Sequence, residues 1–325
     1  MTDVLFGQSY FLRFDPKLWD AQQPYPPLGT LYAAAYTRQR GYTVALFDAM
    51  LADSEQDWAR ALDAHQPRCA VVYEDNFNYL SKMCLGRMRA AALEMIRLAR
   101  ARGCTVIVAG ADATDHADLY LAHGADFALL GEGELTLGEL LDALTGRPAA
   151  RPLAEILGLA WPGRPAAQTP RRPDLRELDA LPFPAWDLVE VPRYRAVWQA
   201  RHGYFSMNLV TTRGCPYHCN WCAKPIWGQR YHARSPENVV AEMRWLRERY
   251  QPDHLWFADD ILGLKPGWIE HWARLLQAAG LRIPFKCLMR ADLVSEAAAA
   301  GLAAAGCQIV WLGAESGSQK ILDAM

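Results

Sequence analysis

Apolar residues over the first 146 positions alternate between short continuous runs and runs with helical spacing. A short apolar run is typical of a buried strand, and apolar residues three or four positions apart are typical of an amphipathic helix. Strict alternation of the two favours a parallel sheet with helices on both faces. Residues 1–146 are therefore expected to form a doubly wound α/β domain. The pattern predicts strands at 4–6, 44–47, 70–73, 106–109 and 127–130, and helices at 28–40, 56–65, 87–102 and 135–145.

Residues 147–204 break this alternation because they contain nine prolines. Proline lacks a backbone N–H and has a fixed φ, which disfavours long helices and central strands. The segment is also rich in arginine and is predicted to be a linker.

The alternation resumes over residues 205–325, which are expected to form part of a (βα) barrel. The predicted fold class is thus α/β, with a doubly wound parallel-sheet domain followed by a partial (βα) barrel. Because the sequence stops at Met325 just after a helix begins, we expect the barrel to be truncated at its C-terminus. The predicted strands are 205–211, 254–257, 285–289 and 308–312, and the predicted helices are 236–250, 268–279 and 295–305.

Charge and composition narrow the possible partners. The chain has 34 basic and 36 acidic residues, so no net field favours nucleic acid or anionic lipid. The N-terminus lacks a basic region followed by an apolar run, and the cytoplasm is the expected location. The most apolar stretch, 297–314, is interrupted by Gly301, Gly306 and Gln308, so we interpret it as a helix and a buried strand rather than a membrane span.

Three of the eight cysteines are closely spaced in one predicted loop. Cys215, Cys219 and Cys222 form a C-x3-C-x2-C pattern after the first barrel strand. Three thiolates from one loop can bind three irons of a [4Fe–4S] cubane and leave the fourth iron open. Zinc is the alternative, but a structural zinc site needs four ligands, and His218 would place all four within eight residues.

This cysteine spacing, with an aromatic residue before the last cysteine, resembles the cluster loop of the radical S-adenosylmethionine (SAM) superfamily. The resemblance continues through 255–260 and 313–318, after the second and fourth barrel strands. It implies that the three cysteines hold a catalytic cluster whose open iron binds SAM. The resemblance also implies that Trp221, in the cysteine loop, meets the adenine of SAM through its backbone. The other implied SAM-binding residues, at the carboxyl ends of barrel strands, are Asp259, Asp260, Arg290, Glu315 and Ser316.

Each of these positions also has a structural interpretation. The two aspartates could cap the following helix, Arg290 could pair with Asp292 on the surface, and Glu315 could be an acid at a helix start.

In the first domain, Pro26-Pro-Leu-Gly29 opens a predicted helix, Gly110-Ala-Asp112 follows the fourth predicted strand and Gly131-Glu-Gly-Glu134 follows the fifth. This order resembles the cobalamin-binding domain that precedes many radical SAM barrels. Glycines after predicted strands would let the backbone approach a large ligand at the carboxyl edge of the sheet. The implied cobalamin-binding residues are Leu28, Gly29, Glu74, Asp75, Gly110, Asp112, Gly131, Glu132 and Gly133.

The first domain departs from the family pattern in two ways. The Asp-x-His-x-x-Gly motif is missing, because no histidine occurs before His65, so cobalt would lack an imidazole from that loop. The usual Gly-Gly after the fourth strand is Gly110-Ala111. His116 could be an unusual cobalt ligand or an ordinary helix-start histidine.

Methylthiotransferases also join such a domain, with three cysteines, to a radical SAM barrel, so Cys69, Cys84 and Cys104 need an interpretation. Cys69 and Cys104 fall at the amino ends of predicted strands, opposite the binding edge. We interpret them as buried thiols.

The resemblance implies an enzyme that uses a [4Fe–4S] cluster, SAM and cobalamin to generate a 5′-deoxyadenosyl radical and methylate an unactivated carbon. A flavodoxin or ferredoxin would supply electrons, and the substrate would be a small molecule, a lipid or another natural product. One alternative is a radical cyclase or oxidase resembling the anaerobic magnesium-protoporphyrin ester cyclase. Another is a cobalamin-binding carrier or sensor with a vestigial barrel.

Overall fold

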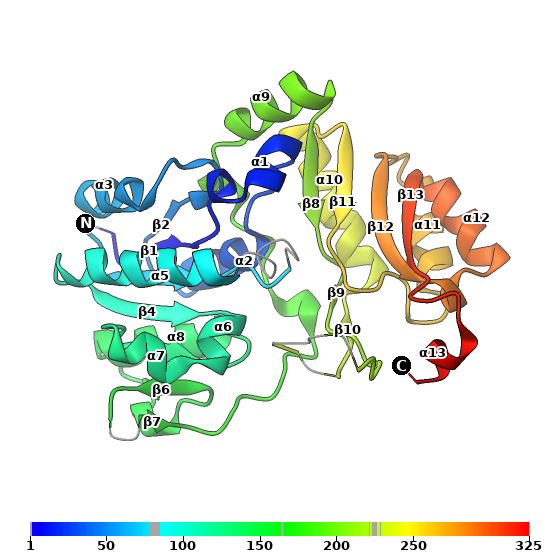
Figure 1. The fold of residues 1–325 in the computed structure, drawn as a ribbon. Helices are drawn as coiled ribbons and strands as arrows, with labels where there is room; N and C mark the ends of the chain where they lie inside the picture. The colour runs from blue at the N-terminus through cyan, green and yellow to red at the C-terminus, as the bar shows by residue number, and fades with distance from the viewer. Residues whose placement is uncertain are drawn as a thin grey trace. The chain divides into compact units, whose positions relative to one another are not determined.

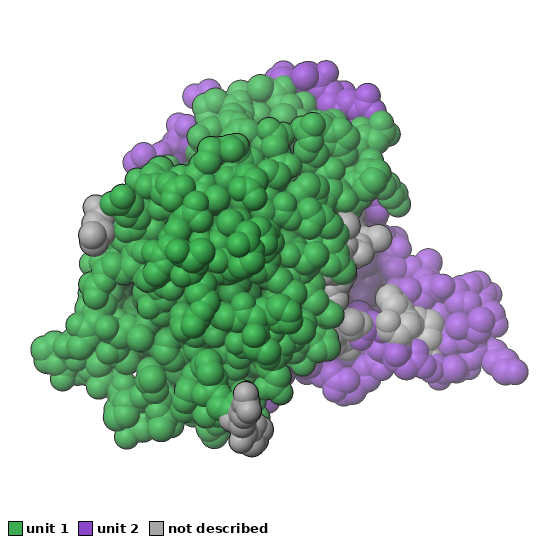
Figure 2. Space-filling model, turned by 60° about the vertical axis from the view of Figure 1, so that its left-hand side comes forward, with its two compact units in different colours: residues 1–175, 181–197 green, residues 176–180, 198–325 purple. Residues whose placement is uncertain are grey.

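The computed structural model describes residues 2–77, 85–163, 166–220, 222, 226–227 and 229–324. The chain divides into two compact units, coloured separately in Figure 2. Unit 1 comprises residues 1–175 and 181–197, and unit 2 comprises residues 176–180 and 198–325.

Unit 1 is built on a sheet whose strands run in the order β2-β1-β3-β4-β5-β6-β7. The first five strands are parallel, and they confirm the five strands predicted for this part of the chain. Every residue of β1 and β3 is buried, as expected for central strands covered on both faces. The bounds are β1 Val4–Gly7, β2 Val44–Phe47, β3 Cys69–Tyr73, β4 Thr105–Ala109 and β5 Phe127–Leu129.

Helices cover both faces of this sheet, which confirms the doubly wound arrangement (Figure 1). On one face, helices α3 (Glu55–His65) and α5 (Leu85–Arg100) meet, and the Trp58 indole donates a 3.0 Å hydrogen bond to the Met95 carbonyl. On the other face lie α2 (Leu28–Gln39) and α8 (Glu134–Thr145). Among the described residues the unit also contains the short helices α1 Pro16–Ala21, α6 Ala111–Asp115 and α7 Ala117–Ala122.

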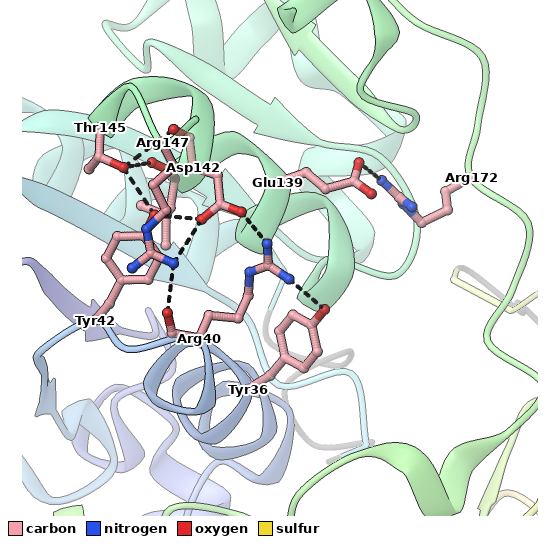
Figure 3. A network of polar contacts seen from close by, with 9 residues as sticks. Tyr36, Arg40, Tyr42, Glu139, Asp142, Thr145, Arg147 and Arg172 are labelled. Atoms are coloured by element: carbon pink, nitrogen blue, oxygen red, sulfur yellow. Dashed lines mark hydrogen bonds and ion pairs between the residues drawn. The ribbon is translucent and has the colours of Figure 1, made fainter. Parts of the chain in front are cut away.

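A polar network joins α2 to α8 (Figure 3). Asp142 of α8 forms an ion pair with Arg40 and accepts a 2.7 Å hydrogen bond from the Tyr42 hydroxyl. The Arg147 guanidinium donates a 2.7 Å hydrogen bond to the Arg40 carbonyl. Arg172, from the predicted linker, pairs with Glu139 of the same helix. Part of the predicted linker is therefore fixed to unit 1.

The structure divides the chain differently from the expected boundaries at 146 and 204. Strands β6 (Leu159–Trp161) and β7 (Ala167–Gln168) extend the sheet of unit 1 in antiparallel fashion, and α9 (Val191–His202) is a helix of three turns. The prolines are compatible with these elements because they lie at the ends of the elements or outside them. Pro192 occupies the first turn of α9, where its missing N–H removes no helical hydrogen bond.

Unit 2 contains a parallel sheet in the order β13-β12-β11-β8, which is the sequential order of strands in a (βα) barrel. The predicted βα alternation is confirmed, and helices α10, α11 and α12 pack side by side (Figure 1). The strands are β8 Ser206–Leu209, β11 His254–Phe257, β12 Phe285–Arg290 and β13 Cys307–Gly313; the helices are α10 Pro236–Tyr250, α11 Trp268–Ala278 and α12 Glu296–Ala305. A short helix, α13 Gln319–Asp323, follows β13.

The prediction that strand β13 is buried is wrong. It was expected to be buried, but Ile309 is 50% exposed and Trp311 is 56% exposed. Within the described residues β13 is an edge strand that pairs only with β12, so its side chains lack neighbours on one side.

None of the helices in the described ranges is both long enough and apolar enough to cross a bilayer.

Candidate functional site

The cysteine loop is closed at its base by a short antiparallel ribbon. Strand β9 (Thr212–Arg213) pairs with β10 (His232–Ala233) just before and after the loop. Gly214 follows β9 with φ of +81°, and a Cβ at this position would lie 2.2 Å from the Arg230 carbonyl oxygen. The two ends of the loop therefore approach too closely for any residue except glycine.

The three cysteines line one cavity of about 330 Å³. It lies at the carboxyl ends of β11, β12 and β13 and is also lined by Asp260, Arg290 and Glu315. Three of the six predicted SAM-binding residues thus meet the predicted cluster ligands. The other lining residues are Tyr217, Ile261, Leu288, Met289, Trp311, Leu312 and Gly313.

The thiols share this cavity without being arranged as metal ligands. No group of three His, Cys, Asp or Glu side chains within the described ranges is positioned to hold a metal ion.

Arg290 contacts the cysteine loop directly. Its guanidinium carbon lies 3.6 Å from the centre of the Tyr217 ring, and Tyr217 stands between Cys215 and Cys219. Arg290 also donates hydrogen bonds of 3.0 and 3.1 Å to the two oxygens of Asp292, which raises the Arg290 pKa. The surface pair considered from the sequence is present, and the same arginine also packs on the loop.

Asp259 and Asp260 have opposite environments although they are adjacent. Asp260 is exposed and lines the cavity, whereas Asp259 is 3% exposed and is not among the lining residues. Both oxygens of Asp259 accept hydrogen bonds from Thr211 and Thr212. Burial raises the Asp259 pKa to about 6, although these hydrogen bonds work in the other direction.

Of the remaining predicted SAM-binding residues, the structure describes Glu315 and Ser316. Glu315 has a φ of +57°, a left-handed conformation that is costly for a residue other than glycine and is frequent at functional sites. Ser316 does not line the cavity, and its hydroxyl accepts a 3.1 Å hydrogen bond from the Ser318 N–H. Trp221 lies outside the described residues.

In unit 1, the start of α2 and the ends of strands bring several cobalamin candidates together. Asp75 follows β3, and its Oδ1 accepts a 3.0 Å hydrogen bond from the Gly29 N–H. Gly29 and the adjacent Leu28 form the buried first turn of α2. A Cβ at Gly110 would lie 2.6 Å from Glu74 Cβ, and one at Gly133 would lie 2.7 Å from the Tyr73 ring. At both glycines, side chains from the end of β3 fill the space that a Cβ would need.

The other predicted cobalamin-binding residues at this edge form hydrogen bonds with other residues of the chain. Asp112 accepts 2.7 Å hydrogen bonds from Arg89 and Tyr120. Burial opposes them, but these bonds hold the Asp112 pKa below its ordinary value. The Gly131 N–H donates a 3.1 Å bond to the Thr114 hydroxyl, and Glu132 accepts one of 2.5 Å from the Leu175 N–H.

His116 lies between α6 and α7 on the surface, with its Nε2 3.7 Å from Asp112 Oδ1. This placement matches the ordinary helix-start histidine considered from the sequence.

Glu74 is expected to make the stability of unit 1 depend on pH. Burial raises its pKa from 4.5 to about 7, against the hydrogen bonds from Ser9 that lower it. A carboxyl with a higher pKa in the folded chain binds its proton more tightly when folded, so stability falls as pH rises through this window. We expect a loss on the order of 2 kcal/mol between about pH 5 and about pH 7.5.

The measurement is urea unfolding of the chain at the two pH values, followed by near-ultraviolet circular dichroism. Glu74→Gln cannot titrate, so its stability should vary less with pH. Equal pH dependence in both proteins would show that the protonation of Glu74 does not contribute.

Several residues around the cysteine loop were missed from the sequence. Thr211, Thr212 and Arg234 fix the chain on either side of the loop, and Arg234 forms a buried ion pair with Glu242 of α10. The two threonines next to the cysteine motif were a possible signal. The pairing of Arg234 with Glu242 depends on the packing of a strand end on a helix and leaves no pattern in the sequence.

The cysteines of unit 1 lie where the sequence predicted. Cys69 begins β3 and Cys104 directly precedes β4, and both thiols are buried at the amino ends of these strands. The Cys104 thiol donates a hydrogen bond of 3.4 Å to the Pro67 carbonyl. Cys84 lies outside the described residues.

Two protein families match separate parts of the chain. Residues 19–141 match the B12 binding domain, and residues 209–325 match the radical SAM superfamily. An uncharacterized methyltransferase, PH0819 of Pyrococcus horikoshii, is 27% identical over 303 residues. That alignment covers 92% of this chain but 62% of the relative, so the chain spans less than two thirds of the relative's length.

Two solved structures share the fold. The radical SAM methyltransferase TsrM from Kitasatospora setae, with tryptophan substrate and a SAM analogue bound, superposes with a TM-score of 0.74 at 20% identity, covering 99% of this chain and 61% of TsrM. The cobalamin-dependent SAM radical enzyme OxsB, with aqua-cobalamin and SAM bound, gives a TM-score of 0.75 at 18% identity, covering 99% of this chain and 45% of OxsB.

Proposed function

Because this chain belongs to the cobalamin-binding radical SAM superfamily, with a B12-binding domain before a radical SAM domain, we propose that it is a methyltransferase acting on an unactivated carbon. The observation that carries the proposal is the cavity that Cys215, Cys219 and Cys222 share with Asp260 and Glu315. Three thiols are the donor set that a cluster with one open iron needs, and the two carboxylates could bind SAM beside it.

The side chains that line the cavity have the chemistry that an iron–sulfur cluster and SAM would need. Cys215, Cys219 and Cys222 would hold a [4Fe–4S] cluster, which supplies the electron that splits SAM into methionine and a 5′-deoxyadenosyl radical. Asp260 and Glu315 offer acceptors for the methionine ammonium and the ribose hydroxyls. Leu288, Met289 and Trp311 give the cavity apolar walls. Trp221 and Ser316 remain proposed SAM contacts on the resemblance alone.

Unit 1 would hold cobalamin, which supplies the methyl group that is transferred. The proposed contacts lie at the first turn of α2, at Glu74 and Asp75 after β3, at Gly110 and Asp112 after β4, and at 131–133 after β5. The Gly110 and Gly133 positions have no room for a side chain, because the Glu74 and Tyr73 side chains pack against them. No histidine precedes His65, so the lower face of cobalt would receive no imidazole from the first loop.

The partners follow from the same chemistry. We propose a small-molecule or natural-product substrate and an electron donor such as flavodoxin or ferredoxin, since a radical SAM cluster takes up one electron in each cycle. The substrate named for TsrM is tryptophan.

Product analysis tests this function without knowledge of the substrate. The chain is reconstituted anaerobically with iron, sulfide and cobalamin and incubated with SAM and a low-potential reductant. A methyltransferase should form S-adenosylhomocysteine, from methylation of cobalamin, together with 5′-deoxyadenosine. A radical cyclase or oxidase should form only 5′-deoxyadenosine, and a carrier or sensor should form neither. The absence of S-adenosylhomocysteine would therefore contradict the proposed methyltransferase.

A further inference from the structure

The segment that enters the cysteine loop lies beside Asp259. Strands β8 and β11 are parallel neighbours, with Leu209 opposite Phe257, and the Ala258 N–H donates a 2.8 Å hydrogen bond to the Leu209 carbonyl. Thr211 and Thr212 leave the end of β8, and Asp259 leaves the end of β11. The carboxyl of Asp259 therefore reaches the chain just before the loop.

Four donors converge on this carboxyl. Its Oδ1 accepts from the Thr211 N–H at 2.7 Å, the Thr212 N–H at 2.7 Å and the Thr212 hydroxyl at 2.8 Å. Its Oδ2 accepts from the Thr211 hydroxyl at 3.0 Å. Asp259, Thr211 and Thr212 are all buried. A buried N–H without a partner is costly, so the two backbone donors in particular need this carboxylate.

The same short segment is held from its other side by Arg234. The Arg234 N–H donates a 2.8 Å hydrogen bond to the Thr211 carbonyl, and its guanidinium donates one of 2.8 Å to the Val210 carbonyl. Hydrogen bonds thus hold the C=O groups of residues 210 and 211 and the N–H groups of residues 211 and 212. Cys215 follows three residues after Thr212, so the position of this segment determines where the first thiol lies.

We propose that Asp259 is a positioning residue that fixes the entry of the cysteine loop, and that it does not contact SAM. The inference rests on the proposed function, and it replaces the SAM-binding role that the family resemblance implied for this residue. Asp260, whose carboxyl is exposed and lines the cavity, keeps the SAM-binding role.

The geometry requires a strong acceptor at Oδ1, which takes both backbone N–H groups and the Thr212 hydroxyl. Each of these four groups donates its hydrogen bond to the Asp259 carboxyl. Asparagine has the same shape but no charge, so the three donors on Oδ1 would bond a neutral amide oxygen, which is a weaker acceptor, while the Thr211 hydroxyl could accept from the new NH₂ group. Asp259→Asn is therefore a nearly isosteric test of the proposed role.

The test compares Asp259→Asn with Asp260→Asn in the 325-residue chain reconstituted with iron and sulfide. We expect Asp259→Asn to lose iron to a chelator about tenfold faster than wild type, because supports of metal ligands have effects of that size. Asp260→Asn should keep iron at the wild-type rate and instead weaken the SAM-induced change in the cluster EPR spectrum. Wild-type iron retention in Asp259→Asn, with a SAM defect like that of Asp260→Asn, would overturn the inference.

Thr212→Val keeps the test valid if Asp259→Asn does not fold. It removes one of the four donors and leaves Asp259 and both backbone N–H groups in place. A faster loss of iron than wild type supports the inference, and an unchanged rate overturns it.

A measurement on the metal-free protein separates this inference from the proposed function. The Thr211 and Thr212 amides should exchange with D₂O about tenfold faster in Asp259→Asn, because each loses a hydrogen bond to a charged group. If the wild-type chain binds no cluster, the proposed function fails, and amide exchange still tests the contact. If wild type binds a cluster but the exchange rates are equal, only the role of Asp259 fails.

Discussion

Replacement of Cys219 by alanine is expected to leave the reconstituted chain with almost none of the about four irons that a bound cubane contains. Cys219 is the middle cysteine of the motif, and it lines the same cavity as Cys215 and Cys222. Two thiolates cannot anchor three irons, and among the described residues no further cysteine lines that cavity. Anaerobic reconstitution, desalting and iron analysis measure the outcome, together with the loss of the SAM-perturbed EPR signal.

Two cysteines of unit 1 provide the matched control. Cys69 and Cys104 are buried, and burial raises the Cys69 pKa to about 11, so this thiol is protonated and unsuited to bind iron at neutral pH. Cys69→Ala and Cys104→Ala should therefore keep full iron. Full iron in Cys219→Ala, or its loss in the Cys69→Ala variant without unfolding, would mean that the cluster is held elsewhere.

The two α/β patterns were predictable because most of the strands of unit 1 are continuous apolar runs and most of the long helices have an apolar face. In β3, for example, all five residues are buried, so the run in the sequence directly reflects the covered sheet. The segment after 146 was not predictable in the same way. Strands β6 and β7 are three and two residues long, and such short strands lie below what periodicity can detect.

Burial at β13 could not be inferred from composition. Its apolar sequence is the same kind of run as in β3, but exposure depends on whether a neighbouring strand is present. Trp311 is more than half exposed because, within the described residues, β13 pairs on one side only.

The meeting of the cysteines with Asp260, Arg290 and Glu315 was predictable from one rule, because carboxyl ends of parallel strands share one edge of the sheet. The difference between Asp259 and Asp260 was not. Adjacent side chains point in different directions, and a sequence does not specify which of the two faces the cavity. Only the positions of Thr211 and Thr212 on the neighbouring strand reveal that Asp259 is already engaged.

The second large effect is expected at Gly214. Replacement by alanine should destabilise the loop by about 2–5 kcal/mol, since the left-handed φ costs about 1–2 kcal/mol and steric overlap in a packed site adds about 1–3 kcal/mol. The overlap is with backbone, because the new Cβ would lie 2.2 Å from the Arg230 carbonyl oxygen. The β9–β10 ribbon must then separate, and Cys215, the next residue, moves with it. We expect Gly214→Ala to lose most of its iron.

Gly203 separates the two contributions because it has nearly the same backbone conformation without the overlap. Its φ is +75°, and a Cβ there would meet nothing within 4 Å. Gly203→Ala should therefore cost only the conformational part, about 1–2 kcal/mol, and should retain iron at the wild-type level. Thermal melting and iron analysis on both variants make the comparison. Equal iron in the two variants would show that the ribbon can open without displacing Cys215, and that the narrow base of the loop is not needed to hold the cluster.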